Sequence, residues 1–406
     1  MLKRILGKIS IVWNNIFWKI VTLFYKKDEN LCVIGGWGGQ RFADNSRYMF
    51  LEKSSLKKVW VTESEELYEF LKESGYKVVL KGSKESRRIH LRAKYHVTDW
   101  GVTDIDSKYS VGAQRIFLWH GIPLKKVWKA QFDNSQNKVE RILNKMKVFA
   151  ASYTWGLPSI GCWDNNELLV TSQFVEELFD EMVTNRRQKY IHAQYPRVSY
   201  LREEGLGFLL PREQKIVEEI SKYKEEGYKV VMYLPTFRDA QDNPFLGEKD
   251  KDAVNSFFEH MKNEKILFIA KPHMADAEDF NNRKCMVLEA TVDIYPFLKM
   301  TDCLITDYSS VAFDYLALDR PIIYYVYDYE DYRDKDRGLA LDFDENTAGT
   351  KVYSLAEVQR AIDNVVQQGM DDGYGEKRKQ LLEKIYTPEY QKVAEVLQDG
   401  MRNVER

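Results

Sequence analysis

Short apolar runs alternate with charged, helical stretches along most of this chain, and the whole alternation occurs twice. The runs are rich in Val, Ile and Leu, and they end at a glycine, a proline or a polar residue. Strands that are buried on both faces of a parallel sheet have this composition, and strand–helix alternation is typical of α/β folds. The sequence therefore predicts parallel sheets that are covered by helices.

The predicted strands form two series, which is what 406 residues allow if the chain folds as two domains. The first series is Leu31–Ile34, Lys58–Thr62, Lys77–Leu80, Tyr95–Thr98, Ile116–Trp119, Val148–Ser152 and Leu168–Ser172; the second is Lys229–Leu234, Ile266–Ala270, Met286–Leu288, Cys303–Thr306 and Ile322–Val326. Helices are expected at Ser64–Glu73, Ala356–Val366 and Glu376–Leu397, and a charged helical region covers 200–227. We place the domain junction there, with one Rossmann-like domain at 28–205, a second at 206–406, and a cleft between them.

Residues 1–27 form a separate segment with apolar residues at helical spacing. Large apolar side chains, among them Trp13 and Phe17, share one face, and lysines and asparagines occupy mostly the other. The charges interrupt the segment too often for a spanning helix, and no signal-peptide cleavage site follows it. A basic amphipathic helix lying in an anionic membrane surface fits this pattern, and a helix packed on its own domain is the alternative.

Composition excludes several classes of function. The net charge is -2, so nothing global indicates nucleic acid. The four cysteines stand far apart without a CxxC pair, which predicts reduced thiols rather than a disulfide framework or a zinc site. The sequence is that of a cytosolic protein, with no cofactor expected.

His120 closes one of the predicted strands and is followed by a chain breaker and two cations. The breaker is Gly121, and Lys125 and Lys126 come soon after it. Ligands of open α/β sheets bind at the carboxyl ends of the strands, where an imidazole can move a proton beside a phosphate. A histidine that packs at a strand end and bonds a neighbouring backbone explains the same pattern equally well when it is considered alone.

Two strand ends in the second half favour the chemical interpretation. One strand is followed by Pro235, Thr236 and Arg238, and the next by Lys271 and His273. A hydroxyl and a guanidinium suit contact with phosphate or ribose, although a surface Arg–Asp pair would also fit. Histidines at equivalent strand ends of both halves, each beside cations, favour two halves of one site.

A third strand end combines hydroxyls with carboxylates. The strand ends at Thr306, a polar turn follows at Asp307, and Ser309 and Ser310 precede a helix that contains Asp314. Free backbone N–H groups at a helix start can hold a diphosphate, and two serines and two aspartates exceed what ordinary capping needs.

Two weaker patterns complete the set. The cluster Gly35–Gly39 lacks the spacing of a dinucleotide motif, so close backbone approach by an acceptor at Gly35, Gly36 and Gly38 is the better interpretation. Asp104–Asp106 is a lone Asp-x-Asp, which is too common to indicate a metal site.

Together these motifs resemble the CDP-glycerol glycerophosphotransferases, which make teichoic acids and related capsule polymers. The resemblance rests on Trp119-His120-Gly121 with Pro123 and a following Lys, Leu234–Arg238, Lys271–His273, Thr306–Ser310, Phe313-Asp314, Arg320-Pro321, Tyr332 and Arg337-Gly338. It runs from about Gly35 to Tyr390 in the family's order. It implies a GT-B architecture and monotopic association with the cytoplasmic face of the membrane. The family's polymerases often carry a further N-terminal domain, for which this chain has no room, so a primase-like or short capsule enzyme is favoured.

The resemblance also implies a reaction. The hydroxyl of a lipid-linked saccharide acceptor attacks the β-phosphorus of CDP-glycerol or CDP-ribitol, and CMP leaves. His120 would be the general base, and His273 would bind or protonate the diphosphate. The donor-binding residues would be Lys125, Pro235, Thr236, Arg238, Lys271, Thr306, Asp307, Ser309, Ser310 and Asp314. The cations could replace a metal, so no metal site is expected, and a homo-oligomer is left open.

Two other functions fit the same sequence. A nucleotide-sugar glycosyltransferase shares the architecture, and the fold alone cannot separate it from a glycerophosphotransferase. A non-catalytic membrane scaffold of a polymer-export complex would leave the strand-end histidines without a role.

Overall fold

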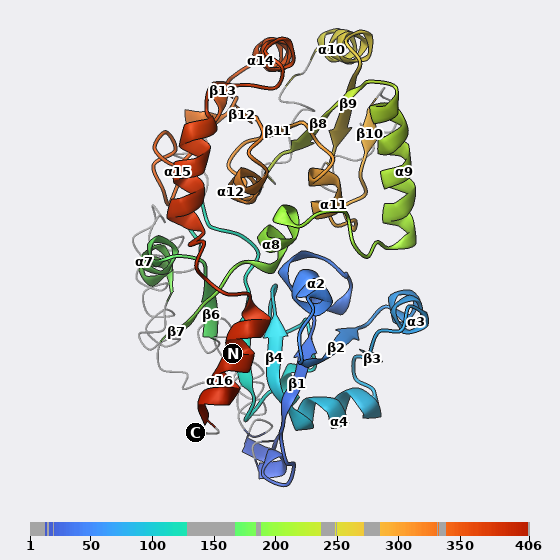
Figure 1. Cartoon of the computed structure of the whole chain (residues 1–406), viewed down its shortest axis with the longest axis vertical. Helices are drawn as coiled ribbons and strands as arrows, with labels where there is room; N and C mark the ends of the chain where they lie inside the picture. The colour runs from blue at the N-terminus through green and yellow to red at the C-terminus, as the bar shows by residue number, and fades with distance from the viewer. Residues whose placement is uncertain are drawn as a thin grey trace, which may run out of the picture. The chain divides into compact units, whose positions relative to one another are not determined.

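The computed structural model describes residues 13, 16–18, 20–127, 167–183, 188–236, 248, 250–271, 285–330, 332 and 338–404. Contacts between Cα atoms divide them into two units (Figure 1). Unit 1 takes the described residues up to His120, those of 127–200, and those from Tyr386 onward. Unit 2 takes Gly121–Lys126 and the described residues of 201–385.

Unit 1 is built on a seven-stranded sheet of order β3-β2-β1-β4-β5-β6-β7, in which every neighbouring pair is parallel. Its strands are β1 (Asp28–Ile34), β2 (Lys57–Thr62), β3 (Val78–Leu80), β4 (Ala93–Thr98), β5 (Gln114–Phe117), β6 (Glu167–Val170) and β7 (Lys189–His192). Its helices are η1 (Trp37–Gly39), α2 (Asp44–Leu51), α3 (Glu65–Glu73), α4 (Lys84–Arg92), η2 (Ser107–Tyr109), α7 (Gln173–Met182), α8 (Pro196–Arg202, which ends in unit 2) and α16 (Val393–Val404).

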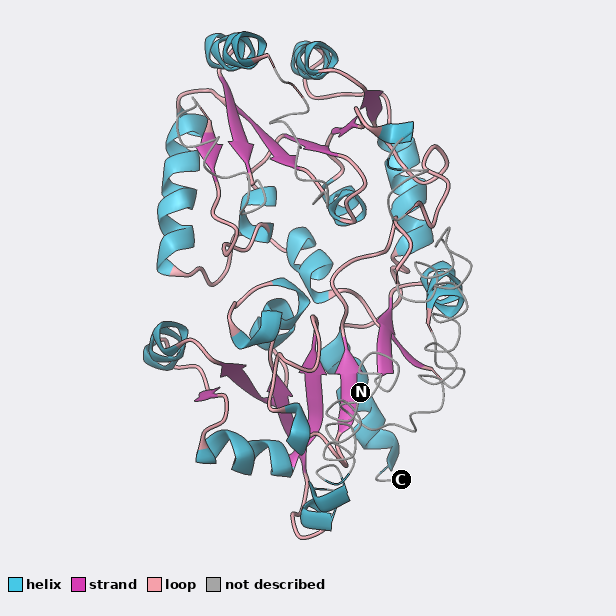
Figure 2. Ribbon diagram, turned by 180° about the vertical axis from the view of Figure 1, so that it is seen from behind, coloured by secondary structure: helices cyan, strands magenta, loops and turns pink. Residues whose placement is uncertain are grey.

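Unit 2 is built on a six-stranded parallel sheet of order β10-β9-β8-β11-β12-β13. Its strands are β8 (Lys229–Leu234), β9 (Ile266–Ala270), β10 (Met286–Val287), β11 (Cys303–Thr306), β12 (Ile322–Tyr325) and β13 (Thr350–Val352). Its helices are α9 (Pro211–Glu225), α10 (Lys251–Asn263), α11 (Tyr295–Leu298), α12 (Val311–Tyr315), η5 (Leu316–Leu318), α14 (Leu355–Gln367) and α15 (Gly375–Ile385). Figure 2 shows both sheets from behind, with helices against their faces.

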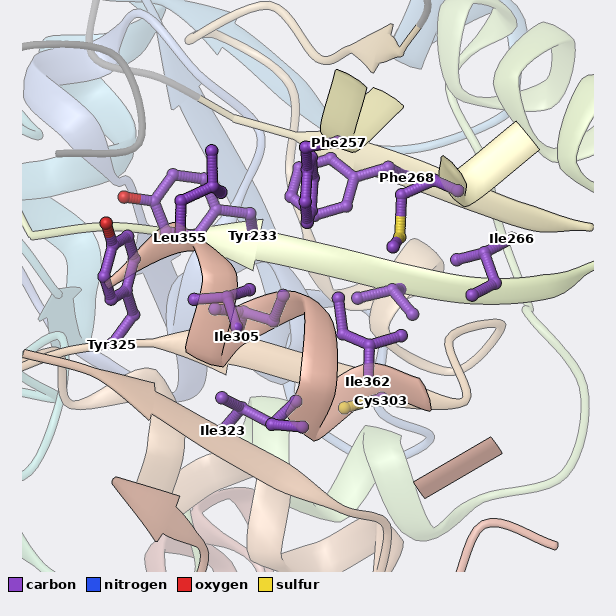
Figure 3. Packing of buried hydrophobic residues seen from close by; sticks show 14 of the residues in the cluster. Tyr233, Phe257, Ile266, Phe268, Cys303, Ile305, Ile323, Tyr325, Leu355 and Ile362 are labelled. Atoms are coloured by element: carbon purple, nitrogen blue, oxygen red, sulfur yellow. The ribbon is translucent and has the colours of Figure 1, made fainter. Parts of the chain in front are cut away.

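The core of unit 2 shows how the sequence pattern becomes packing. Ser354 caps α14 by accepting a hydrogen bond from Glu357 N–H, and the apolar residues of the helix then recur on one face. Those residues and Phe257 of α10 lie against strands β8, β9, β11 and β12, which contribute Phe268 and Ile305 (Figure 3). Burying each such side chain stabilises the fold by about 1.5–3 kcal/mol.

Two features of the C-terminal region differ from the sequence prediction. The helix expected at Glu376–Leu397 is interrupted between α15 and α16, because Pro388 lacks the N–H that a continuous helix needs. After this break the chain returns to unit 1, although the sequence assigned it to the second domain. Backbone bonds from Thr387 to Thr171 and from Gln194 to Gln391 hold it there.

The other differences concern individual strands. Strands β7 and β13, each at the edge of its sheet, were not predicted, because their residues are half exposed and form no apolar run. The strand expected at Ile116–Trp119 already ends at Phe117. The strand expected at Val148–Ser152 lies outside the described residues.

The N-terminal segment turns its apolar side outward in the part that the structure describes. The described residues between 13 and 22 are helical. Trp18 packs edge-on against Tyr109 and Thr22 is buried, whereas Phe17, Leu23 and their apolar neighbours are exposed. Among the described helices none is long and apolar enough to cross a membrane.

Candidate functional site

Each sheet reverses its strand order at one place, and the candidate residues gather at both places. In unit 1 the reversal lies between β1 and β4, and in unit 2 between β8 and β11. Ligands of open α/β sheets bind beyond the carboxyl ends of the strands at such switch points. Each unit therefore offers one candidate half-site.

The glycines after β1 allow a very close approach of the loop that follows β4. A Cβ atom on Gly35 would lie 2.4 Å from the Asp104 carbonyl oxygen, and one on Gly36 would lie 3.0 Å from Asp99 Oδ1. Both glycines are buried, so the protein itself fills the space that the sequence assigned to an acceptor. Gly38 is only half buried and has a φ of +67°, which favours glycine.

Asp104 holds this half-site together. Its buried carboxylate accepts hydrogen bonds from the backbone N–H groups of Gly38, Asp99, Trp100 and Gly101, at 2.7–3.2 Å. Burial raises the pKa of Asp104 to about 6, against the opposing effect of these hydrogen bonds. The lone Asp-x-Asp is thus part of a loop-fixing network, and the described residues contain no group of three or more His, Cys, Asp or Glu side chains that could hold a metal ion.

Asp99 is a second buried carboxyl that the sequence analysis missed. Burial raises its pKa well above the ordinary value, and Asp44 and Asp104 add to the effect. Oδ2 accepts from Ser46 N–H at 3.1 Å, while Oδ1 is a buried oxygen without a hydrogen-bond partner among the described residues. Its position directly after the predicted strand Tyr95–Thr98 was a signal that could have found it.

His120 lies beyond the end of β5, half buried, and its ring is fixed by the same loop. Nδ1 lies 3.2 Å from the carbonyl oxygen of Asp99, which can only accept, so Nδ1 carries the hydrogen. Nε2 is then the nitrogen that accepts a proton in the neutral ring. Two indoles contact the imidazole, with ring centroids 4.9 Å away for Trp100 and 3.9 Å away for Trp119.

The segment before His120 is itself held in an unusual conformation. Trp119 has a φ of +59°, which is uncommon for a bulky residue and typical of functional sites. Its carbonyl oxygen accepts from Asn45 Nδ2 at 3.0 Å. Asn45 is fixed in turn by α8, because its Oδ1 accepts from Arg197 N–H, and Arg197 forms a buried ion pair with Asp44 at 2.6 Å.

In unit 2 the predicted residues at the ends of β8 and β11 contact each other. Thr236 donates from its N–H to both oxygens of Asp307, at 2.9 and 3.0 Å, and from its hydroxyl to Oδ1, at 2.5 Å. The Thr306 hydroxyl donates to the Leu234 carbonyl oxygen. Thr306, Asp307 and Thr236 are buried, so they join the strand ends beneath the half-site.

The remaining described donor-side residues are half buried, except for Asp314, which is buried. Ser309, Ser310, Pro235 and Lys271 are half buried. Ser310 makes no side-chain capping bond to α12, and Ser309 Oγ accepts from Val311 N–H at a long 3.4 Å. The Lys271 ammonium donates to the Val292 carbonyl oxygen. Asp314 is buried and accepts a hydrogen bond from the Tyr295 hydroxyl.

Three predicted residues need separate mention. Lys125 lies in the segment that crosses into unit 2, where it bridges to Leu339 in antiparallel fashion. Arg238 and His273 lie outside the described residues.

Comparison with known proteins decides the family. The sequence model of the CDP-glycerol:poly(glycerophosphate) glycerophosphotransferases matches residues 18–399. The chain belongs to this family. The predicted resemblance is thereby confirmed, and with it the expectation of an enzyme that transfers glycerol phosphate from CDP-glycerol.

Individual relatives of this glycerophosphotransferase agree with the family assignment. It is 24% identical over 393 residues to a teichoic acid poly(glycerol phosphate) polymerase of Bacillus spizizenii, covering 90% of this chain and 93% of that one. It is 25% identical to the corresponding polymerase of Staphylococcus epidermidis but spans only 47% of its length. The wall teichoic acid polymerase TagF superposes with a TM-score of 0.68 at 17% identity and full coverage of both chains. The predicted α/β, GT-B-like class with two Rossmann-like units is confirmed.

Proposed function

We propose that this chain transfers glycerol phosphate from CDP-glycerol to a hydroxyl group of a lipid-linked saccharide, at the cytoplasmic surface of the membrane, in teichoic acid synthesis. The acceptor oxygen forms a bond to the β-phosphorus, the bond from that phosphorus to the bridging oxygen breaks, and CMP leaves with the electron pair. The hydroxyl proton passes to His120 Nε2.

The observation that carries this proposal is the hydrogen bond between His120 Nδ1 and the Asp99 carbonyl oxygen. It selects the tautomer in which Nε2 can act as a base, and the surrounding rings hold the imidazole in one orientation. A positioned base typically contributes about 10²–10⁴-fold to a rate. Gly35 and Gly36 act indirectly in this scheme, because they let the loop that carries Asp99 approach, while Gly38 is the glycine open to the acceptor.

Unit 2 is proposed to bind the donor. Ser309 and Ser310 contact the diphosphate with their hydroxyls, and Lys125 and Lys271 contribute positive charge. Thr236 and Asp307 support these residues from below, since their mutual bonds fix the ends of two neighbouring strands. Arg238 and His273 stay assigned to the diphosphate from the sequence motifs alone.

The exposed apolar residues of the N-terminal segment support the membrane part of the proposal. Leu23 and Phe24, in the turn that follows the helix, are 80% and 83% exposed, whereas large apolar side chains are mostly buried in a globular domain. Together with the exposed Lys26 they would lie in an anionic membrane surface, where the lipid-linked acceptor resides.

A donor panel tests the function. The purified protein is incubated with a lipid-linked disaccharide and with CDP-glycerol, CDP-ribitol or a UDP-sugar, and products are identified by mass. We expect CMP release and addition of one or more glycerol phosphate units with CDP-glycerol. Turnover of the UDP-sugar alone would indicate a glycosyltransferase, and no turnover of any donor would indicate a scaffold. The length of the protein does not indicate how many glycerol phosphate units it adds, because the Bacillus spizizenii relative that matches over most of its length is a polymerase. The mass of the product shows whether one unit or many are added.

A further inference from the structure

Successive contacts link four planar groups of unit 1, among them the imidazole of His120. The indoles of Trp37 and Trp100 are stacked, with centroids 4.6 Å apart and an interplanar angle of 17°. The guanidinium of Arg41 lies 4.5 Å from the Trp37 ring centroid. The imidazole of His120 also contacts Trp100, with its centroid 4.9 Å from that of the indole and the two planes tilted by 37°.

Trp37 and Trp100 come from two loops, which the carboxylate of Asp104 holds together. Asp104 accepts from Gly38 N–H, next to Trp37, and from Trp100 N–H. Trp37 adopts a φ of +48°, which is unfavourable for a bulky residue and is retained only where the surroundings impose it.

Packing alone does not account for this arrangement. Trp100 remains 41% exposed, and Trp37 and Arg41 are half buried, so the stack lies at the surface of unit 1 rather than in its core. A surface-exposed indole beside a titratable group is typical of a binding site, because it offers an apolar face and a polar edge to a ligand that has both.

We propose that Trp37 and Trp100 form a platform that binds the saccharide of the acceptor beside His120. A sugar ring has an apolar face of C–H groups, which suits the exposed part of Trp100, and hydroxyls that can reach water or the Arg41 guanidinium. The inference rests on the proposed role of His120 as the base.

The alternative ligand is the cytosine of the donor, since bases also stack on aromatic side chains. The position of His120 favours the acceptor. A general base must lie within hydrogen-bond reach of the hydroxyl that it deprotonates, so a group that contacts the neighbouring indole lies next to the attacking end. In CDP-glycerol the cytidine is separated from that end by the diphosphate.

The test compares two soluble acceptors that carry the same short alkyl group, one a disaccharide and the other glycerol phosphate without a sugar. Trp100→Ala should raise the KM for the disaccharide by about two- to tenfold, as expected for the loss of one aromatic contact. The KM for the sugar-free acceptor, the kcat and the Kd of CDP-glycerol should change less than this. Trp100→Phe should give an intermediate KM, and Tyr353→Ala, which removes an exposed aromatic residue from unit 2, should leave all constants unchanged.

Three results would overturn the platform. An unchanged disaccharide KM with a lower kcat would make Trp100 a positioning residue for His120 only. An equal rise in KM for both acceptors would show that Trp100 does not contact the sugar. Weaker CDP-glycerol binding would indicate that the cytosine stacks on Trp100 instead. Calorimetric titration of the disaccharide into wild type and Trp100→Ala needs no turnover. It therefore decides the platform even if the wild type transfers nothing, an outcome that would contradict only the proposed function.

Discussion

Thr236 and Asp307 connect the two central strands of unit 2 at their carboxyl ends. Three hydrogen bonds from the threonine converge on one buried carboxylate, and the Tyr308 N–H adds a fourth. The strands β8 and β11 are neighbours at the point where the sheet order reverses. The geometry of the proposed donor site therefore depends on a pair of side chains that face away from solvent.

Asp307→Asn should weaken both stability and donor binding. The amide keeps one acceptor oxygen but turns N–H donors toward the backbone N–H groups, and leaving such groups unpaired costs about 1–3 kcal/mol. Urea unfolding and calorimetric titration with CDP-glycerol measure the two effects. Glu219→Gln, which changes an exposed carboxylate on α9, is the matched control. If Asp307→Asn behaves like this control, the pair does not support the strand ends.

His120→Ala should lower kcat by about 10²–10⁴-fold, because the proton of the acceptor hydroxyl loses its destination. CDP-glycerol binding and the thermal midpoint should stay close to those of the wild type. His192→Ala is the control, since this histidine is exposed on unit 1, where it pairs with Glu176 and contacts the ring of Tyr390. Wild-type turnover in His120→Ala would show that His120 is not the general base.

Replacing Phe17, Leu23 and Phe24 by serine should reduce membrane binding without affecting the fold, because all three side chains are exposed. Burial of one such side chain is worth about 1.5–3 kcal/mol, so the fraction bound should fall by at least about tenfold. Flotation with phosphatidylglycerol vesicles measures this, and transfer to short soluble acceptors should be retained. A variant that floats as well as the wild type would show that the helix serves packing alone.

Low pH should destabilise unit 1 through its buried histidines. Burial lowers the pKa of His90 to about 4, and that of His96 well below its ordinary value. Between pH 6.5 and 4 these histidines bind protons in the unfolded chain but not in the folded chain. Their contribution to the free energy of unfolding is therefore complete above pH 6.5 and is lost as the pH falls. His90→Gln removes one such group. Its thermal midpoint should therefore fall less than that of the wild type between pH 7 and pH 5, and equal falls would contradict the assignment.

Local sequence patterns were enough to predict most of the strands, the class of the fold and the positions where chemistry could occur. Strands such as β8 and β9 begin and end at the predicted residues, because a strand buried on both faces needs a continuous apolar run. His120, Thr236 and Asp307 were found because each lies within two residues of the end of such a run. These signals depend only on residues that are close together in the sequence, so each can be recognised in a single segment.

Tertiary structure decided what depends on contacts between distant segments. The edge strands β7 and β13 form because a neighbouring strand pairs with them, and their own residues give little signal. That α16 belongs with unit 1 depends on bonds such as that from the Tyr95 hydroxyl to the Leu397 carbonyl oxygen. In the same way, Asp104 fixes two loops and Asp99 orients His120 only because β1, β4 and β5 lie side by side. A residue's type is written in the sequence, but whether its carboxylate binds a ligand or holds a loop depends on which backbone N–H groups the fold places around it.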